Sequence, residues 1–121
     1  MIRNVFIVGI GGLVGSAARY LVVSHLTGSS KFPYGTFTVN IVGCLLIGLL
    51  AGFADRFNWL PEWRLFLGTG ICAGFTTFSS LAIENVRLLQ DKDYLTFFLY
   101  TTLSFVVGMG AAILGLAFAR G

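Results

Sequence analysis

The chain has 121 residues, of which 56% are hydrophobic and 11% are charged, and its mean hydropathy is +0.87. Soluble domains carry about 25% charged residues, so this composition excludes an ordinary water-soluble globule. The net charge of +3 comes from eight Lys and Arg residues that are scattered singly along the chain. Because nucleic-acid binding needs basic residues gathered into a patch, the charge pattern excludes that function too.

Four apolar stretches are each long enough to cross a bilayer core, which takes roughly 20 apolar residues in a helix. They are residues 5–26, 37–57, 63–89 and 95–119. The first stretch is too long for the core of a signal peptide, so we expect it to be a retained span. The sequence therefore predicts an all-α membrane protein, with residues 1–121 forming a single four-helix transmembrane domain.

The first span carries small residues at helical spacing, followed by one charge. Gly11 and Gly15 are four residues apart, and Arg19 continues the same helix face. Arg19 is expected near the end of the span, where its guanidinium can snorkel to the membrane surface. The small-residue spacing recurs in the next two spans, at Gly48 and Gly52 and at Gly70 and Gly74. Such spacing lets helix backbones approach closely in lipid, so it predicts tight helix packing without naming the partners.

Polar side chains inside membrane spans are costly and are therefore functional candidates. Asn40 stands at the start of the second span, where its amide either caps the helix or faces a cavity. Tyr100 and Ser104 are four residues apart in the fourth span and share one face. The simpler alternative for this pair is a hydrogen bond between helices.

The third span contains the stretch GFTTFSS, residues 74–80. Its four hydroxyl residues surround Phe78: Thr76, Thr77, Ser79 and Ser80. The β-branched pair and the nearby glycines weaken a helix, so we expect the third helix to be broken here. Lipid cannot satisfy freed backbone groups, so the break must face protein, water or an ion. Freed carbonyls suit a hard cation, whereas amides, hydroxyls and the positive edge of a phenyl ring suit a small anion.

Basic residues are divided equally between the two sides of the membrane. Four spans place both termini on one side, and the two sets are Arg3, Arg56, Arg64 and Arg120, and Arg19, Lys31, Arg87 and Lys92. Orientation normally follows an excess of Lys and Arg in the cytoplasmic loops, and here there is none. Either the residues closest to the spans count for less, or the chain inserts both ways and pairs as an antiparallel, dual-topology dimer.

The polar inventory disfavours an enzyme and a proton-coupled exporter. The sequence has no nucleophile–base set, no metal-ligand cluster and no phosphate loop. A small multidrug exporter needs a deep carboxylate in its first span, and this span has none. Glu84 is shallow and is expected to anchor the far end of the third span. Cys44 and Cys72 lack metal-binding spacing and are expected to act as small buried hydrophobes.

The motifs of the first three spans together resemble the Fluc (CrcB) family of fluoride channels. The similar blocks are GIGGLVGSAARYLV, GTFTVNIVGCLLIG and GTGICAGFTTFSSLAIENVRLL, and the similarity extends over essentially the whole chain. The resemblance implies a passive fluoride-selective channel that exports cytoplasmic fluoride across a bacterial inner membrane. It implies a dual-topology antiparallel homodimer with two pores, surrounded by lipid. The pore-lining residues would be Asn40, Phe78, Ser80, Tyr100 and Ser104.

The resemblance also implies roles beside the pores. A structural sodium ion at the dimer interface would be held by the backbone carbonyls of Ala73 and Thr76. Arg19 would attract anions near a vestibule. Structural roles would fall to the remaining polar residues of the third span: Thr77, Ser79 and Glu84.

Two positions depart from the family's pattern. Leu81 stands where the family typically has a second pore phenylalanine, and Gly108 replaces a second hydroxyl one turn beyond Ser104. Leucine has no positive ring edge, so each pore would lose one group that faces the anion. The chain is therefore either a conducting homodimer, or a non-conducting or accessory subunit that pairs with a related chain.

Overall fold

The structure is a computed structural model, and it describes residues 1–26, 28 and 31–121. The helices follow one another in this order: α1 (Ile2–Leu26), α2 (Tyr34–Phe57), α3 (Pro61–Arg64), η1 (Leu65–Cys72), α4 (Ala73–Phe75), α5 (Phe78–Gln90) and α6 (Tyr94–Arg120). The segment η1 is a π-helix. We call α3, η1, α4 and α5 together the third segment.

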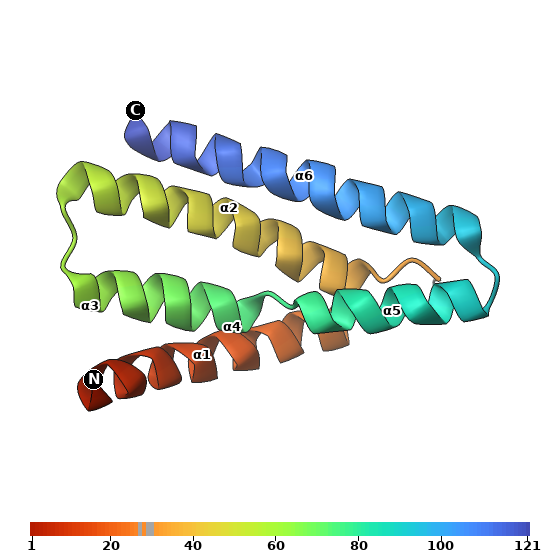
Figure 1. The fold of residues 1–121 in the computed structure, drawn as a ribbon, viewed down its shortest axis with the longest axis horizontal. Helices are drawn as coiled ribbons and strands as arrows, with labels where there is room; N and C mark the ends of the chain where they lie inside the picture. Colours follow the sequence, from red (N-terminus) through yellow and green to blue (C-terminus); the bar gives the residue numbers. More distant parts are fainter. Residues whose placement is uncertain (27, 29–30) are drawn as a thin grey trace.

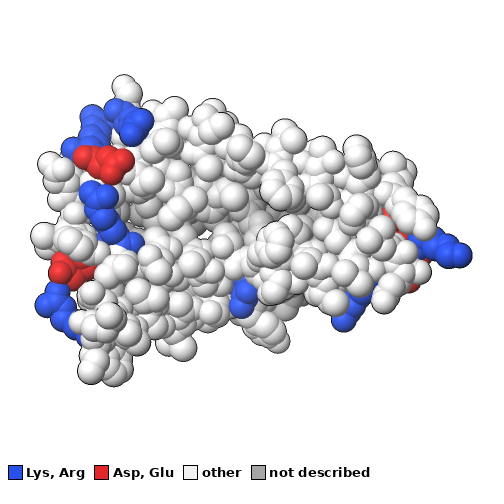
Figure 2. All heavy atoms as spheres, viewed as in Figure 1, with Lys and Arg blue, Asp and Glu red and all other residues white. Residues whose placement is uncertain are grey.

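Four helical segments of the described chain are long and apolar enough to cross a membrane: Ile2–Leu26, Tyr34–Phe57, Pro61–Gln90 and Tyr94–Arg120. Each stretch expected from the sequence lies within one of them. The segments run alternately in opposite directions, so both chain ends lie at the same end of the bundle (Figure 1). Figure 2 shows charged side chains gathered mainly at the two ends of the visible face, with a largely uncharged band between them. This distribution suits a protein whose middle is surrounded by hydrocarbon.

The second and fourth segments form one close pair, in which glycines lie against backbone. A Cβ atom added at Gly115 would lie 2.5 Å from the carbonyl oxygen of Leu45, and one at Gly48 would overlap the carbonyl oxygen of Ala112. A Cβ atom at Gly52 would lie 2.5 Å from the methyl group of Ala119 and 3.0 Å from the carbonyl oxygen of Leu116. Only a residue without a side chain allows this approach, so the α2–α6 contact is backbone against backbone.

The first and third segments form the other close pair. A Cβ atom at Gly70 would lie 2.9 Å from the Cα atom of Gly11, and one at Gly74 would lie 2.8 Å from the carbonyl oxygen of Gly12. Gly15 lies against the carbonyl of Ile71. The tight packing predicted from the glycine spacing is therefore confirmed, and its partners are α1 with η1 and α4, and α2 with α6.

Ion pairs join the helix ends on the side of the two termini. Arg3 bonds Glu62 at 2.6 Å, and this pair connects α1 with α3. Arg64 and Arg120 both approach Asp55, at 3.3 Å and 3.9 Å, and thereby connect the third segment and α6 with α2. All of these side chains are substantially exposed, so each pair contributes little stability by itself.

Candidate functional site

The third segment leaves its helical course for two residues at Thr76 and Thr77. Helix α4 ends at Phe75, and α5 begins at Phe78. Thr76 has φ −92° and ψ 161°, and Thr77 has φ −152° and ψ 117°, so both residues are extended. Thr76 remains attached to the preceding turn, because its amide and its hydroxyl both bond the carbonyl of Cys72 at 3.1 Å.

Thr77 caps the helix that follows. Its hydroxyl oxygen accepts a hydrogen bond from the amide of Ser80 at 3.2 Å, which is the usual bond of an N-cap threonine. The same hydroxyl lies 3.2 Å from the hydroxyl of Ser80 and 3.3 Å from that of Ser79. The hydroxyl-rich stretch therefore forms a local network around the start of α5.

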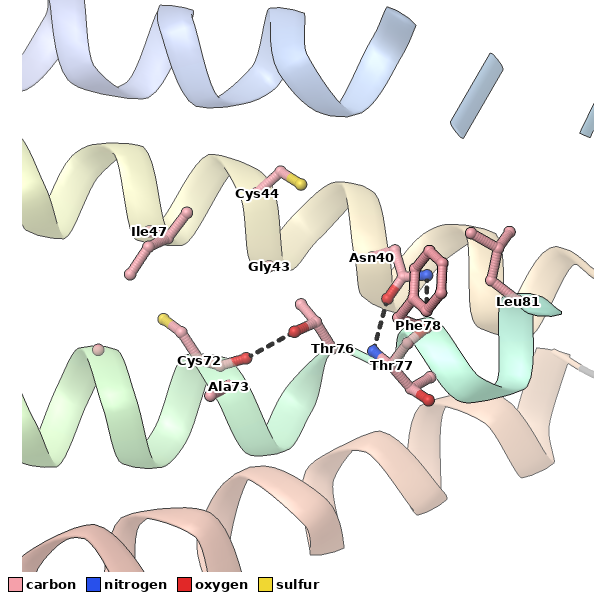
Figure 3. A pocket seen from close by; sticks show the side chains of 11 residues that line it. Asn40, Gly43, Cys44, Ile47, Cys72, Ala73, Thr76, Thr77, Phe78 and Leu81 are labelled. Carbon is pink, nitrogen blue, oxygen red and sulfur yellow. Dashed lines mark hydrogen bonds between the residues drawn. The ribbon is translucent and has the colours of Figure 1, made fainter. Parts of the chain in front are cut away.

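The side chain of Asn40 bridges α2 and the extended residues. Its Oδ1 accepts from the amide of Thr77 at 2.8 Å, and its Nδ2 donates to the carbonyl of Thr77 at 3.1 Å (Figure 3). Because α2 begins at Tyr34, Asn40 lies inside the helix and does not cap it. The cap alternative is therefore wrong, and the side chain of Asn40 lines a cavity.

Backbone carbonyls lose their helical donors at the extended residues, and those of Ala73 and Thr76 are among them. In a continuous helix the amide of Thr77 would bond the carbonyl of Ala73, but it bonds Asn40 instead. The amide of Ser80 would likewise bond the carbonyl of Thr76, but it bonds the Thr77 hydroxyl. The carbonyls of Ala73 and Thr76 are thus released from helical pairing.

A cavity of about 340 Å³ lies beside these residues, between α2 and the third segment. Asn40, Phe78 and Leu81 gather at one end of it, and Ile47 lies at the other (Figure 3). Most of the lining is apolar, and the amide of Asn40 is among its polar groups. The cavity is open on one side, so it is a recess in the surface of the subunit.

Phe78 and Leu81 have opposite environments although both line this recess. The ring of Phe78 is 74% exposed on the subunit surface, whereas Leu81 is 8% exposed and packs with Leu88 and Tyr100. Leu81 is therefore part of the packed interior between α5 and α6.

A second polar cluster joins three helices around Glu84. One carboxylate oxygen accepts from the hydroxyl of Thr36 at 2.9 Å, and the other accepts from the hydroxyl of Tyr100 at 2.8 Å. Tyr100 is fully buried, and Thr36 is 2% exposed. Thr36 was missed by the sequence analysis, although it lies four residues before Asn40 and so shares its helix face. Searching that face for polar residues would have found it.

Removing the Tyr100 hydroxyl tests whether this cluster stabilises the fold. Tyr100→Phe leaves the ring in place but deletes one of the two bonds to Glu84. A hydrogen bond to a charged partner is worth about 1.5 to 3 kcal/mol, so we expect a clearly lower midpoint of thermal unfolding in detergent. Tyr94→Phe is the matched control, because Tyr94 is 61% exposed. Equal midpoints for the two variants would contradict a stabilising role.

Ser104 does not bond Tyr100 in the structure. Its hydroxyl is buried and has no hydrogen-bond partner among the described residues, and the same holds for the hydroxyl of Thr101 and for Oδ1 of Asn85. Gly108 has the thiol of Cys44 beside it, 3.4 Å from where a Cβ atom would lie. Cys44 is half-buried and Cys72 is buried, as expected of small apolar side chains.

Arg19 lies apart from these clusters. It is half-buried on α1, and none of the ion pairs or side-chain hydrogen bonds found in the described ranges involves it. The structure therefore brings together Asn40, Thr77 and Ser80 at the extended residues, and Glu84 with Tyr100 nearby. It leaves Arg19 and Ser104 without a defined partner.

These features define a class of protein. The chain is a multi-pass membrane protein, with hydroxyl and amide groups concentrated at an irregular stretch of one span. Within residues 1–26, 28 and 31–121, no group of three or more His, Cys, Asp or Glu side chains could hold a metal ion. The extended residues and Asn40 offer neutral hydrogen-bond donors and backbone carbonyl acceptors.

The chain belongs to the CrcB family, as its sequence motifs indicated. The family model described as CrcB-like protein, Camphor Resistance (CrcB), matches residues 6–116. The chain is 43% identical over 121 residues to a protein of Flavobacterium psychrophilum, with 98% of each chain covered. It is 42% identical to one of Azobacteroides pseudotrichonymphae, covering 95% of this chain and 94% of that one, and 44% identical to one of Gloeothece citriformis, covering 93% and 94%. Each of these relatives is named "Fluoride-specific ion channel FluC", so the family consists of channels, not enzymes.

Proposed function

We propose that this protein is the subunit of a fluoride-selective channel of the bacterial inner membrane, through which cytoplasmic fluoride leaves passively. The observation that carries the proposal is the similarity to fluoride-specific channels along almost the whole chain, including the residues of the irregular third segment. Passive export is useful because HF crosses membranes from acidic surroundings and dissociates inside. The trapped anion then leaves down its gradient.

The proposed pore uses neutral groups to replace the water around fluoride. Asn40 keeps one amide hydrogen beyond its bond to Thr77, and Phe78 presents an exposed ring with a positive edge. Further donors along the pore are hydroxyl groups: Ser80, Tyr100 and Ser104. The unpartnered hydroxyl of Ser104 supports this role, because buried polar groups normally have a partner.

We place Arg19 at the entrance, where a half-buried guanidinium without an acidic partner among the described residues raises the local anion concentration. Thr77 and Ser79 hold the start of α5, and Glu84 holds three helices together. These residues support the pore and are not expected to bind fluoride directly.

We propose that the working channel is an antiparallel, dual-topology homodimer in which the broken third segments of the two copies meet. The exposure of Phe78 and Ala73 on a single subunit supports this arrangement. An irregular backbone is tolerated at membrane depth only where protein or water covers it. A second copy of opposite orientation would cover it.

Dual topology predicts that a tag at either terminus is accessible from both sides of the membrane in one population of cells. Two or three lysines added at the C-terminus should bias insertion and reduce dimer formation, because the basic residues are otherwise balanced four to four. Co-expression of a chain with the opposite bias should restore the dimer. A single orientation for the unmodified chain would rule out the antiparallel pair.

We further propose a structural sodium ion at the dimer interface, held by the carbonyls of Ala73 and Thr76. The fit of these residues rests on their released carbonyls, since oxygen ligands suit a hard cation. Bound there, the cation would offset the partial negative charge of oxygens that lack donors.

A second candidate function is favoured by one observation. Leu81 is packed in the interior, so the chain has a single exposed phenylalanine at the recess. In this second function, the chain is the accessory subunit of a heterodimer with a related chain. Membership of a channel family, in contrast, leaves no support for a multidrug exporter.

Growth of bacteria that lack their own fluoride exporter tests the proposed function. Expression of this chain should restore growth in fluoride-containing medium at acidic pH, where HF enters fastest. Expression should make no difference in matched chloride medium. Failure of the chain to restore growth, despite its presence in the membrane, would count against a conducting homodimer.

A further inference from the structure

The side-chain amide of Asn40 forms hydrogen bonds with both the N–H and the carbonyl of the Thr77 backbone. Both polar atoms of the side chain are used, at 2.8 Å and 3.1 Å, against the amide and the carbonyl of the same residue. A neighbouring β-strand would pair with an extended residue in the same way. The paired bonds therefore fix both the Asn40 side chain and the extended backbone of Thr77.

The bond to the Thr77 amide competes directly with the helix. Without Asn40, the nearest helical acceptor for that amide is the carbonyl of Ala73, four residues earlier. If that bond formed, α4 would continue by one residue and the Ala73 carbonyl would be occupied. By bonding the Thr77 amide, the side chain of Asn40 thus leaves both lone pairs of this carbonyl available to another ligand.

The rest of the α2 face is shaped to receive the same two threonines. Gly43 follows Asn40 by three residues, and a Cβ atom at Gly43 would overlap the Cγ2 methyl of Thr76. The absent side chain at Gly43 leaves room for Thr76, while Asn40 holds Thr77. Helix α2 therefore positions both extended residues, although they belong to the third segment.

From this geometry we infer that Asn40 is a positioning residue for the cation site, in addition to any contact with the anion. By accepting the Thr77 amide, it keeps the Ala73 carbonyl available to the proposed sodium ion. The inference rests on the proposed sodium site. Since the same amide lines the recess, one side chain supports both the cation site and the anion path.

The test compares how strongly sodium stabilises the purified dimer in different variants. The midpoint of thermal unfolding is measured while sodium replaces N-methylglucamine at constant ionic strength, and the half-effect sodium concentration is read for each protein. Asn40→Leu loses both bonds to Thr77, and we expect its half-effect concentration to rise about tenfold, which corresponds to about 1.4 kcal/mol of binding free energy. An unchanged concentration would overturn the inference.

Asn40→Asp separates positioning from anion binding. Whether charged or protonated, the aspartate keeps an oxygen that accepts the Thr77 amide, so we expect that its half-effect sodium concentration does not rise above that of the unmodified chain. It loses the amide hydrogens, so fluoride efflux should fall. If Asn40 bound only the anion, Asn40→Leu and Asn40→Asp would both lower efflux and neither would alter the sodium dependence.

Two further proteins complete the experiment. Thr36→Val is the matched control, because it removes another buried hydrogen bond from α2, to Glu84, one turn away. Its sodium dependence should not change. If Asn40→Leu forms no dimer, the half-effect sodium concentration is measured for Asn40→Ser instead. The short serine side chain cannot bond both the amide and the carbonyl of Thr77, so the same rise is expected. If the thermal midpoint of the unmodified dimer does not depend on sodium, both the sodium site and this inference are overturned. The fluoride efflux of the unmodified dimer tests the proposed channel function separately.

Discussion

Phe78→Leu is expected to lower fluoride efflux from liposomes by about tenfold or more, a change that corresponds to about 1.4 kcal/mol in the barrier. The leucine keeps dispersion contact but removes the positive ring edge that faces the anion. Leu81 cannot take over, because it is already a leucine and is packed between α5 and α6. Efflux is measured with a fluoride electrode after a potassium ionophore dissipates the membrane potential.

Phe118→Leu is the control for this experiment. Phe118 is 75% exposed, almost the same as Phe78, but it lies near the end of α6, away from the extended residues. Its replacement should leave efflux unchanged. Full efflux from Phe78→Leu would show that shape and hydroxyl donors carry the ion without the ring edge.

Gly15→Ala is expected to destabilise the fold by at least about 3 kcal/mol, the upper range for overpacking of a close contact. The added methyl group would overlap the carbonyl oxygen of Ile71 and approach the amide of Phe75 to 2.9 Å. Both neighbours are backbone atoms of the third segment, so α1 would have to move away from it. The gain in helix propensity, about 1 kcal/mol, is too small to compensate.

Gly9→Ala provides the comparison on the same helix. A Cβ atom there meets nothing within 4 Å, so the change should leave the thermal midpoint the same or raise it. The two variants differ only in what the new methyl group meets. Similar midpoints for both would mean that the α1–η1 contact is less close than the structure indicates.

The spans and their close packing could be predicted from the sequence because both depend on local patterns. Apolar stretches of membrane length are visible directly, and glycines four residues apart indicate where backbones can meet. The partner of each glycine row could not be predicted, since it depends on which helices the connections bring together. Gly115 of α6 packs against the backbone of α2, and Gly70 of η1 packs against the backbone of α1.

The candidate site was only partly predictable, because some of its contacts join residues that are far apart in the sequence. The residues of GFTTFSS were recognised from their polarity, and Asn40, Tyr100 and Glu84 were recognised as polar groups inside spans. That Asn40 pairs with a backbone 37 residues away is a tertiary contact with no local signal. The burial of Leu81 likewise follows from the packing of α5 on α6, not from its place in a motif.

Anion efflux from liposomes that contain only the purified chain tests most directly whether this chain alone forms a fluoride-selective channel. Potassium fluoride and potassium chloride are loaded into separate vesicles, and release is followed with the matching electrode after addition of a potassium ionophore. Rapid release of fluoride with chloride release no faster than from empty vesicles is the predicted result. Fluoride release that appears only with Leu81→Phe or a second, related chain would favour the accessory subunit. Fluoride release no faster than from protein-free vesicles would contradict the claim.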